Sequence, residues 1–478
     1  MRKFFAKLAA GALAALLPFL ILAAIGLSIE PQFKNTFLGA LADKFHRLEI
    51  IGKPKIIVVG GSSTAFGLNS DLLSEELGMP VVNFGLYATL GTKLMLDLSR
   101  PVLKSGDIVV LAPELDRQTL SLYFNAESAW QAFDSDMSML RHTRFENYGA
   151  LAGNFWDYAL SKLKYGRLGG LDPDGVYSRS SFDVNGDIIY SRPHNIMPLG
   201  YSPNHPIDLD PSILDDDFAG YVNEFVRFAK GKGAKIYFDF PPMNRLGVVQ
   251  YGDSAAIYEF YLHLAKNLDC EIIGDITAYI LEEPYFYDSN YHLNDSGVLV
   301  RTALLAEDIR RALGIAVPVS IKRPPPPGMP EGETLSGNGA NDASDAYSEY
   351  FLYGPYAGGL VVTGVSEAGK SLGELTIPRV AGGKAVLAIG ERAFAGCGAL
   401  AKLTIGDNIA QIYDYAFEGC GRLEMLVLEI GDPNRVAVGD NLLGGADSCR
   451  IYLSREAFGN FAADYFWGRY SKYMSIIN

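Results

Sequence analysis

The chain has 478 residues, which is too many for one typical domain, so we expect two or three folded units. Acidic residues outnumber basic ones by 55 to 41, and the formal net charge is −14. A nucleic-acid-binding protein needs clustered Lys and Arg to neutralise phosphates, so this balance argues against that class. Four cysteines do not make a disulfide framework in an exported protein of this size.

The amino-terminal segment predicts a membrane anchor. Basic residues occupy three of the first seven positions, and an apolar run without charge follows over residues 8–29. A helix of that length spans about 33 Å, enough for a bilayer core of about 30 Å. We therefore expect a single-pass anchor over residues 1–30, with the bulk of the chain outside the cytoplasm at the cell membrane. The alternative is a signal peptide that is cleaved near Gly26.

Four apolar residues follow at a spacing of four: Phe33, Phe37, Leu41 and Phe45. This spacing predicts an amphipathic helix over residues 31–49. We expect its apolar face to pack into the domain core rather than against lipid.

Residues 31–314 alternate between strand and helix patterns. The β-branched run at 55–59 is typical of a strand buried on both faces of a parallel sheet. Further strands are expected at 81–84, 108–112, 234–240 and 271–273, with helices at 70–77, 90–103, 253–268 and 295–313. Alternation with short links predicts the α/β class, as a doubly wound parallel sheet. An irregular insert over 166–212 interrupts it and contains a hairpin signal, Asn185-Gly186.

A linker follows at 315–349, where four consecutive prolines precede a Gly-, Ser-, Asn- and Asp-rich stretch. The last unit, 350–478, repeats with a period of 23 residues. The pairs in register are Ile389 and Ile412, Phe394 and Phe417, Cys397 and Cys420, and Leu403 and Leu426. Such a period predicts a β-rich solenoid whose small units must stack to bury their apolar faces.

The candidate catalytic residues lie at two distant places in the chain. Ser63 follows the first strand, at the carboxyl end where open α/β sheets place their ligands. Of six histidines, His292 alone lies in a site-like context, just before the last predicted helix, with Asp288 four residues earlier. A serine nucleophile needs a base, and the base needs an orienting group. The simpler interpretation of Ser63 is a helix cap.

These segments resemble a known family. The residues after the first strand read GGSSTAFG, those after the second read NFG, and an Asp and a His precede the last helix. Together they resemble the SGNH (GDSL-like) hydrolase superfamily, most closely its membrane-anchored extracytoplasmic branch, which includes proteins that work on cell-surface polymers. The likeness covers about residues 53–314 and implies a flavodoxin-like sheet with serine hydrolase or acyltransferase chemistry.

The resemblance also implies a role for each matching residue. Ser63 matches the nucleophile, with Ser62 as the alternative, His292 matches the base and Asp288 its partner. The backbone N–H groups of Gly85 and Ser63 would form the oxyanion hole.

The sequence departs from the family pattern at two places. The acid usually stands three residues before the histidine, where this chain has Ser289. Where the family has an oxyanion asparagine after the third strand, the chain has Glu114. Losing one oxyanion donor costs about 3 to 4 kcal/mol of transition-state stabilisation. Glu114 could instead bind a substrate hydroxyl or orient an active-site side chain, and Asn244 and Arg245, after the fourth strand, are further candidates for substrate contact.

The carboxyl-terminal unit resembles the BspA-type leucine-rich repeats of bacterial surface proteins, over about residues 355–478. The likeness is carried by IGERAF at 389–394, by Cys397 and Leu400, and by the same pattern over 412–423. In that family the solenoid is associated with adhesion or protein contact. Cys397 and Cys420 would lie on adjacent rungs, where buried thiols are the commoner outcome than a disulfide.

Two hypotheses follow. The first is an anchored extracytoplasmic serine esterase or acyltransferase that acts on a cell-surface glycan or acylated polymer, with acetyl as the expected acyl group and a repeat domain for adhesion or binding of a protein partner. The alternative is a non-catalytic surface adhesion protein with a degenerate hydrolase-like domain. The remaining histidines show no metal-ligand spacing, so we expect no metal, and we expect no cofactor.

Overall fold

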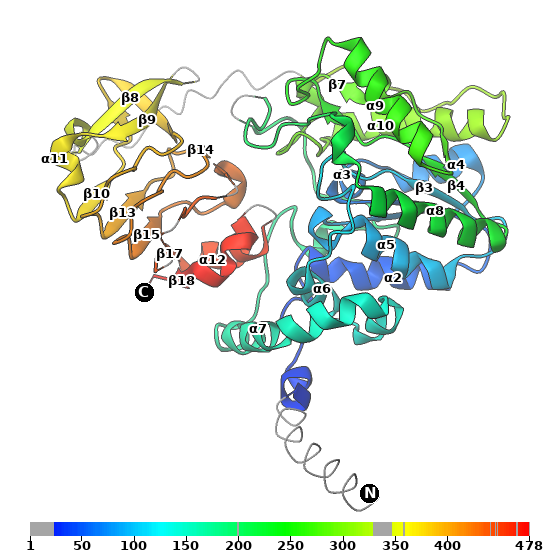
Figure 1. Ribbon diagram of the computed structural model, residues 1–478, viewed down its shortest axis with the longest axis horizontal. Coiled ribbons are helices and arrows are strands. Elements are labelled where there is room, and N and C mark those ends of the chain that lie inside the picture. The colour runs from blue at the N-terminus through cyan, green and yellow to red at the C-terminus, as the bar shows by residue number, and fades with distance from the viewer. Residues whose placement is uncertain are drawn as a thin grey trace, which may run out of the picture.

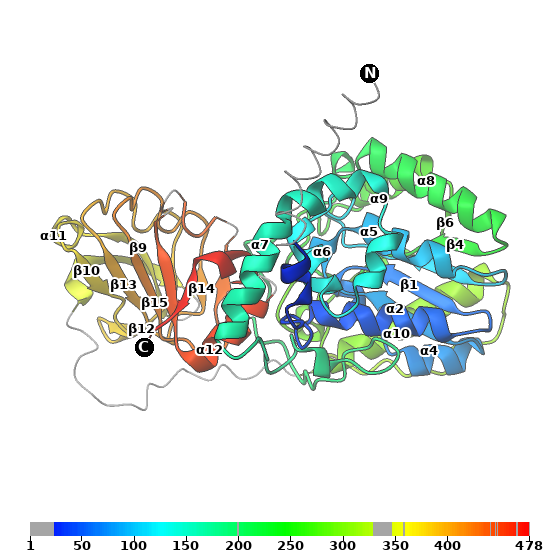
Figure 2. The same cartoon turned by 90° about the horizontal axis from the view of Figure 1, so that it is seen from below.

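The computed structural model shows two units side by side, an α/β domain and a repeat domain (Figures 1 and 2). The structure describes residues 23–197, 200–327, 347–356, 359–439, 441–444, 446, 448–464 and 467–477. The predicted linker lies partly outside these ranges, since residues 328–346 are not described.

The predicted membrane anchor and the membrane localisation are corrected. In the described part of the chain, no helix is long and apolar enough to cross a bilayer. Residues 8–22 of the proposed segment lie outside the described residues, and the described remainder is a helix at 23–28. On the described residues, the predicted fold class is therefore wrong in its transmembrane helix.

Five parallel strands form the central sheet of the α/β domain as described, in the order β2-β1-β3-β4-β6. The strands are β1 (Ile56–Gly60), β2 (Val81–Gly85), β3 (Ile108–Leu111), β4 (Lys235–Phe238) and β6 (Glu271–Ile272). A separate parallel pair joins β5 (Met243–Asn244) to β7 (Ile280–Leu281). The order of the central sheet is flavodoxin-like, with its switch point beside β1.

Alternate strand residues build two hydrophobic layers because successive side chains point to opposite faces. Ile57 and Val59 lie in the layer beneath α2, α5 and α8, whereas Ile56 and Val58 lie in the layer with α4 and α10. The bounds are α2 (Leu41–Ile50), α4 (Ser70–Leu77), α5 (Thr92–Ser99), α8 (Asp216–Gly231), α9 (Ser254–Asn267) and α10 (Asp295–Ala312). Helices thus cover both faces of the sheet.

The segment after residue 30 differs from the single helix that the sequence predicts. Helix begins as a 3-10 turn at Leu38–Ala40 and continues as α2. Phe33 and Phe37 precede the α-helix, yet both are buried in the core. Their spacing of four reflects burial of one side of the chain rather than a continuous helix.

The repeat domain is a solenoid with two sheets in its described residues. One is a parallel sheet of five strands, β10 (Glu374–Thr376), β13 (Lys402–Ile405), β15 (Met425–Leu428), β17 (Arg450–Leu453) and β18 (Met474–Ile476). The other contains β8 (Phe351–Tyr356), β9 (Gly359–Val365), β11 (Val380–Ala381), β12 (Lys384–Ile389), β14 (Gln411–Ile412) and β16 (Ala437–Val438).

Residues 23 apart occupy equivalent places on adjacent rungs, as the sequence predicts. Leu403 pairs with Leu426 in the strand register, and the rings of Phe394 and Phe417 lie 5.3 Å apart. The left-handed backbone conformation also repeats: φ is 54° at Arg392 and 55° at Tyr415, which follows 23 residues later. All four cysteines are buried free thiols.

The repeat domain docks on α7 (Tyr148–Arg167) through its carboxyl-terminal cap, which runs from residue 455 to 477 and contains α12 (Arg455–Ala463) and a 3-10 helix at Trp467–Tyr473 (Figure 2). The rings of Tyr165 and Phe458 lie 6.1 Å apart, and Lys164 Nζ donates to the Met474 carbonyl at 3.0 Å. One hydrophobic cluster runs through both domains. The two domains therefore share a packed interface.

Replacing Phe417 by Ala should lower the free energy of unfolding of the repeat domain by about 3 to 5 kcal/mol, because it removes a fully buried ring that packs on the next rung. Urea unfolding curves of the two proteins measure this loss. The matched control is Glu418→Ala, at the neighbouring partly exposed position, where loss of the ion pair with Arg392 should cost about 1 kcal/mol or less. Equal losses at both positions would contradict the stacked core.

Candidate functional site

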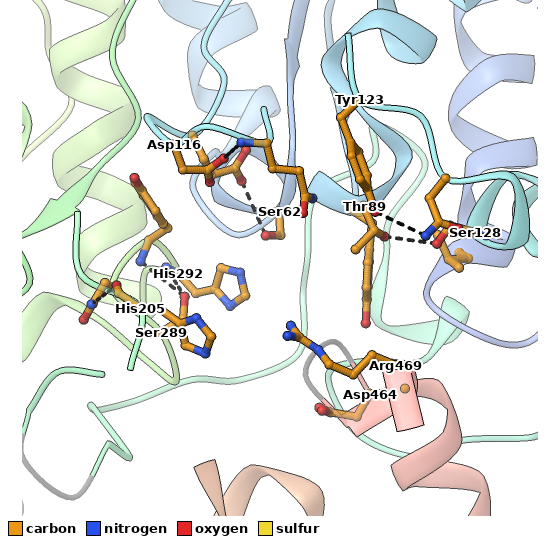
Figure 3. A pocket seen from close by; sticks show the side chains of 18 of the residues that line it. Ser62, Thr89, Asp116, Tyr123, Ser128, His205, Ser289, His292, Asp464 and Arg469 are labelled. Atoms are coloured by element: carbon orange, nitrogen blue, oxygen red, sulfur yellow. Dashed lines mark hydrogen bonds between the residues drawn. The ribbon is translucent and has the colours of Figure 1, made fainter. Parts of the chain in front are cut away.

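A cavity of about 660 Å³ lies at the carboxyl edge of the sheet. Ser62, Glu114 and His292 line it from the α/β domain, and Asp464 and Arg469 line it from the repeat domain (Figure 3). Its volume is in the range of small-molecule binding sites.

The structure distinguishes the two candidate serines. Both belong to the short helix α3 (Ser62–Ala65), which begins directly after β1. Ser62 lines the cavity although only 3% of its surface is exposed, whereas Ser63 is fully buried and does not line it. Ser62, the alternative in the sequence analysis, is therefore the serine that a ligand in the cavity can reach.

His292 and Asp288 meet in the loop before α10. Nδ1 of His292 lies 2.7 Å from Oδ1 of Asp288, and the hydroxyl of Tyr177 donates to Oδ2 of the same carboxylate at 2.7 Å. The imidazole stacks on Phe66, with centroids 4.0 Å apart and planes inclined by 7°. These contacts hold the ring in one orientation, as an acid partner does for a catalytic base.

The sequence of this loop explains why an acid four residues before the histidine can reach it. The hydroxyl of Ser289 accepts the backbone N–H groups of Tyr291 and His292, which tightens the turn. An antiparallel bridge closes the loop between Phe286 and Leu293. The turn thus folds Asp288 back to the imidazole.

Both N–H groups predicted for the oxyanion hole already donate to side-chain oxygens. The N–H of Gly85 donates to Oδ1 of Asn83 at 3.1 Å, and the N–H of Ser63 donates to Oε1 of Glu114 at 2.7 Å. An oxyanion could use either donor only after one of these bonds breaks. This arrangement works against stabilisation of a tetrahedral intermediate, which depends on preorganised donors.

Glu114 occupies the position that the family pattern gives to an oxyanion asparagine. Its carboxyl is buried, which raises its pKa, and the Ser62 hydroxyl donates to Oε1 at 3.4 Å. A Cβ on Gly61 would lie 2.2 Å from Oε2, so the glycine permits this close approach. In place of an oxyanion donor, the site holds a buried acid.

The other predicted contact residues do not line the cavity. Asn244 is buried, and its amide donates to the Gly200 carbonyl at 2.8 Å. Arg245 forms an ion pair with Glu283 at 2.8 Å. Both side chains bind neighbouring protein groups. Their positions therefore do not support the predicted contact with substrate. Among the described residues, no group of three or more His, Cys, Asp or Glu side chains could hold a metal ion.

Sequence reasoning missed three residues of this site: Tyr177, His205 and Arg469. Tyr177 and His205 come from the region of the irregular insert, and Arg469 comes from the cap of the other domain. Burial lowers the pKa of His205 to about 4, and the positive charge of Arg469 acts in the same direction. No local motif marks these residues, because only the packing of distant segments brings His205 and Arg469 to the cavity and Tyr177 to Asp288.

The comparisons with known proteins concern the repeat domain. The family described as "BspA type Leucine rich repeat region (6 copies)" matches residues 368–436, so this part of the chain is a BspA-type leucine-rich repeat region. No curated protein matches the chain. None of the matches supports the SGNH resemblance of the α/β domain.

Two solved structures are similar over part of the chain. A leucine-rich repeat protein from Bacteroides ovatus is 23% identical, with 22% of this chain and 28% of that chain covered and a TM-score of 0.17. The T. pallidum leucine-rich repeat protein is 18% identical, with 23% and 71% covered and a TM-score of 0.17. Because the sequence identities are below 25% and both TM-scores are 0.17, these two matches carry no information about function.

Replacing Glu114 by Gln should change how stability depends on pH. Burial raises the pKa of this carboxyl above 4.5, so the folded protein holds its proton more tightly than the unfolded chain does. The stability from this group is therefore present at low pH and is lost as the pH rises through the folded pKa. The advantage of Glu114→Gln in free energy of unfolding should grow as the pH rises above about 4.5. A difference that does not change with pH, measured by urea unfolding, would contradict this.

Proposed function

We propose that this chain is a recognition protein whose leucine-rich repeat domain binds a protein partner. The observation that carries this proposal is the BspA-type repeat region at residues 368–436, folded as a continuous parallel sheet. Repeats of this kind commonly mediate protein contact, and a solenoid presents an extended surface suited to it.

The outward face of the five-stranded sheet is the proposed binding surface. Leu403 and Ile405 of β13 point into the core, while Lys402 and Thr404, between them, point outward. The strand register places Lys402 beside Met425 and Arg450, so outward side chains form rows across the rungs. Rows of mixed polar and apolar groups on a flat, rigid sheet suit a protein surface.

A charge reversal on this face, Lys402→Glu, should weaken partner binding about tenfold or more, because it places a new negative charge in the proposed contact. Binding is measured on a panel of immobilised acidic and basic proteins. The matched control is Lys384→Glu, an exposed lysine on β12 of the other sheet, which should bind like the original protein. If Lys384→Glu weakened partner binding and Lys402→Glu did not, the contact would lie outside the five-stranded sheet face, and this proposal would be wrong.

A second candidate function is acyl-group chemistry on a cell-surface carbohydrate. One observation favours it: His292, joined to Asp288 at 2.7 Å, lines the same cavity as Ser62. The Ser62 hydroxyl would leave Glu114 and attack the acyl carbonyl while His292 takes its proton. His292 would then pass that proton to the sugar oxygen that leaves as the acyl–oxygen bond breaks, and Asp288 would orient the imidazole. The occupied N–H groups of Gly85 and Ser63 count against this candidate and favour the non-catalytic interpretation.

Fluorophosphonate labelling of the full chain separates the two interpretations. If the site is catalytic, the probe should label the protein, Ser62→Ala should abolish labelling, and Ser63→Ala should keep it, because only Ser62 lines the cavity. Labelling is measured by mass of the intact protein. If the folded protein with its His292 intact is not labelled, the catalytic candidate is excluded and partner binding remains as the proposed function.

A further inference from the structure

A second group of ionisable side chains is buried in the α/β domain, outside the wall of the cavity. Asp239 directly follows β4, Tyr279 ends a 3-10 helix at Ile276–Tyr279, and Asp308 lies in α10. The exposed fractions of Asp239, Tyr279 and Asp308 are 1%, 1% and 6%, and none of the three side chains lines the cavity. Three elements that are distant in the sequence therefore meet at one buried polar point.

The contacts of the Tyr279 hydroxyl require one proton more than the phenol supplies. Its oxygen lies 2.8 Å from Oδ2 of Asp239 and 2.8 Å from Oδ2 of Asp308. A phenol carries one proton, so it donates to only one of these two oxygens. If both acids were ionised, the other contact would bring two lone pairs together in a buried site, which is costly. A proton on one carboxyl turns that contact into a hydrogen bond from the carboxyl to the phenol oxygen.

The other contacts of the two acids indicate where this proton lies. Oδ1 of Asp308 accepts a hydrogen bond from the guanidinium of Arg311, which favours the ionised form of Asp308. Oδ1 of Asp239 accepts the Phe240 N–H at 2.8 Å, so Oδ2 is the oxygen left for the proton. Burial and the two acids raise the pKa of Tyr279, so the phenol keeps its own proton. The resulting chain runs from Asp239 to Tyr279 and from Tyr279 to Asp308.

Burial has the largest effect on both acids. It raises the pKa of Asp239 to about 7 and also raises the pKa of Asp308. The charge of Asp308 acts on Asp239 in the same direction, as the charge of Glu307 does on Asp308, whereas Arg301 opposes the rise at Asp239 and Arg311 opposes it at Asp308. Two acids that share a site titrate as a pair, so the pair retains a proton at pH values where an isolated aspartate has lost it.

We propose that Asp239 and Asp308 share one proton through Tyr279, and that this proton makes the packing of α10 on the sheet sensitive to pH. Loss of the proton would leave two negative charges in one buried site between the end of β4 and α10. The same helix carries Arg301, whose Nη1 donates to the Ser63 carbonyl at 3.4 Å, so the pH-sensitive contact lies on the helix that supports α3. Neither partner binding nor acyl chemistry is needed for this device.

Asp239→Asn in the full chain tests the shared proton. Its side-chain N–H can donate to Tyr279 and its carbonyl can accept the Phe240 N–H, so it imitates the protonated acid at every pH. The folded original protein holds a proton that the unfolded chain releases above about pH 4, so this stability is complete below that pH and is lost as the pH rises to the folded pKa. The unfolding equilibrium constant of the original protein should therefore rise, relative to that of Asp239→Asn, by up to about tenfold per pH unit between about pH 4 and 7 and then level off.

Urea unfolding over this pH range measures the difference, and Glu114 cancels because both proteins contain it. Asp308→Asn should remove the pH dependence in the same way, because one carboxylate can accept the phenol proton alone. The matched control is Glu259→Gln, an exposed acid on α9, which should keep the pH dependence of the original protein. In protein labelled with ¹³C-aspartate, the infrared band of protonated carboxyl groups should be weaker in Asp239→Asn than in the original protein. The proposal would be overturned if neither asparagine variant changed the pH dependence, or if this band were the same in both proteins.

Discussion

The close approach of the Glu114 carboxyl to Gly61 governs the chemistry of the α/β domain. A side chain at position 61 would collide with this carboxyl, so the glycine allows an acid to reach the start of α3. There the acid accepts the Ser63 N–H and the Ser62 hydroxyl. One acid therefore positions the serine that lines the cavity and also occupies a donor that an oxyanion would need. Glu114 thus departs from the hydrolase pattern and weakens the case for hydrolase chemistry.

The second constraint is the docking of the repeat domain. Its cap packs on α7, and a hydrophobic cluster continues from one domain into the other. Because the cap closes one side of the cavity, the repeats do more than display a binding surface. They also supply Asp464 and Arg469 to the wall of a pocket that lies at the sheet edge of the α/β domain.

The sequence predicted the structure best where the local hydrophobic pattern and burial in the folded protein favour the same secondary structure. The buried β-branched run predicted β1, and the 23-residue period predicted which residues of adjacent rungs would meet. The amino-terminal segment shows the opposite case, because apolar length alone suggested a membrane anchor that the described helices do not supply. Likewise, the spacing of Phe33 and Phe37 indicated helix where the chain is irregular but buried.

The sequence by itself determined the strand and helix pattern, the repeat, and the pairing of Asp288 with His292, since each depends on neighbours along the chain. Only the tertiary structure decided which serine faces the cavity, because a shift of one residue in a short helix turns a side chain from the cavity into the core. It alone also decided that Tyr177 holds Asp288 and that Arg469 enters the site. These contacts join segments more than a hundred residues apart, and such contacts leave no periodic trace in a single sequence.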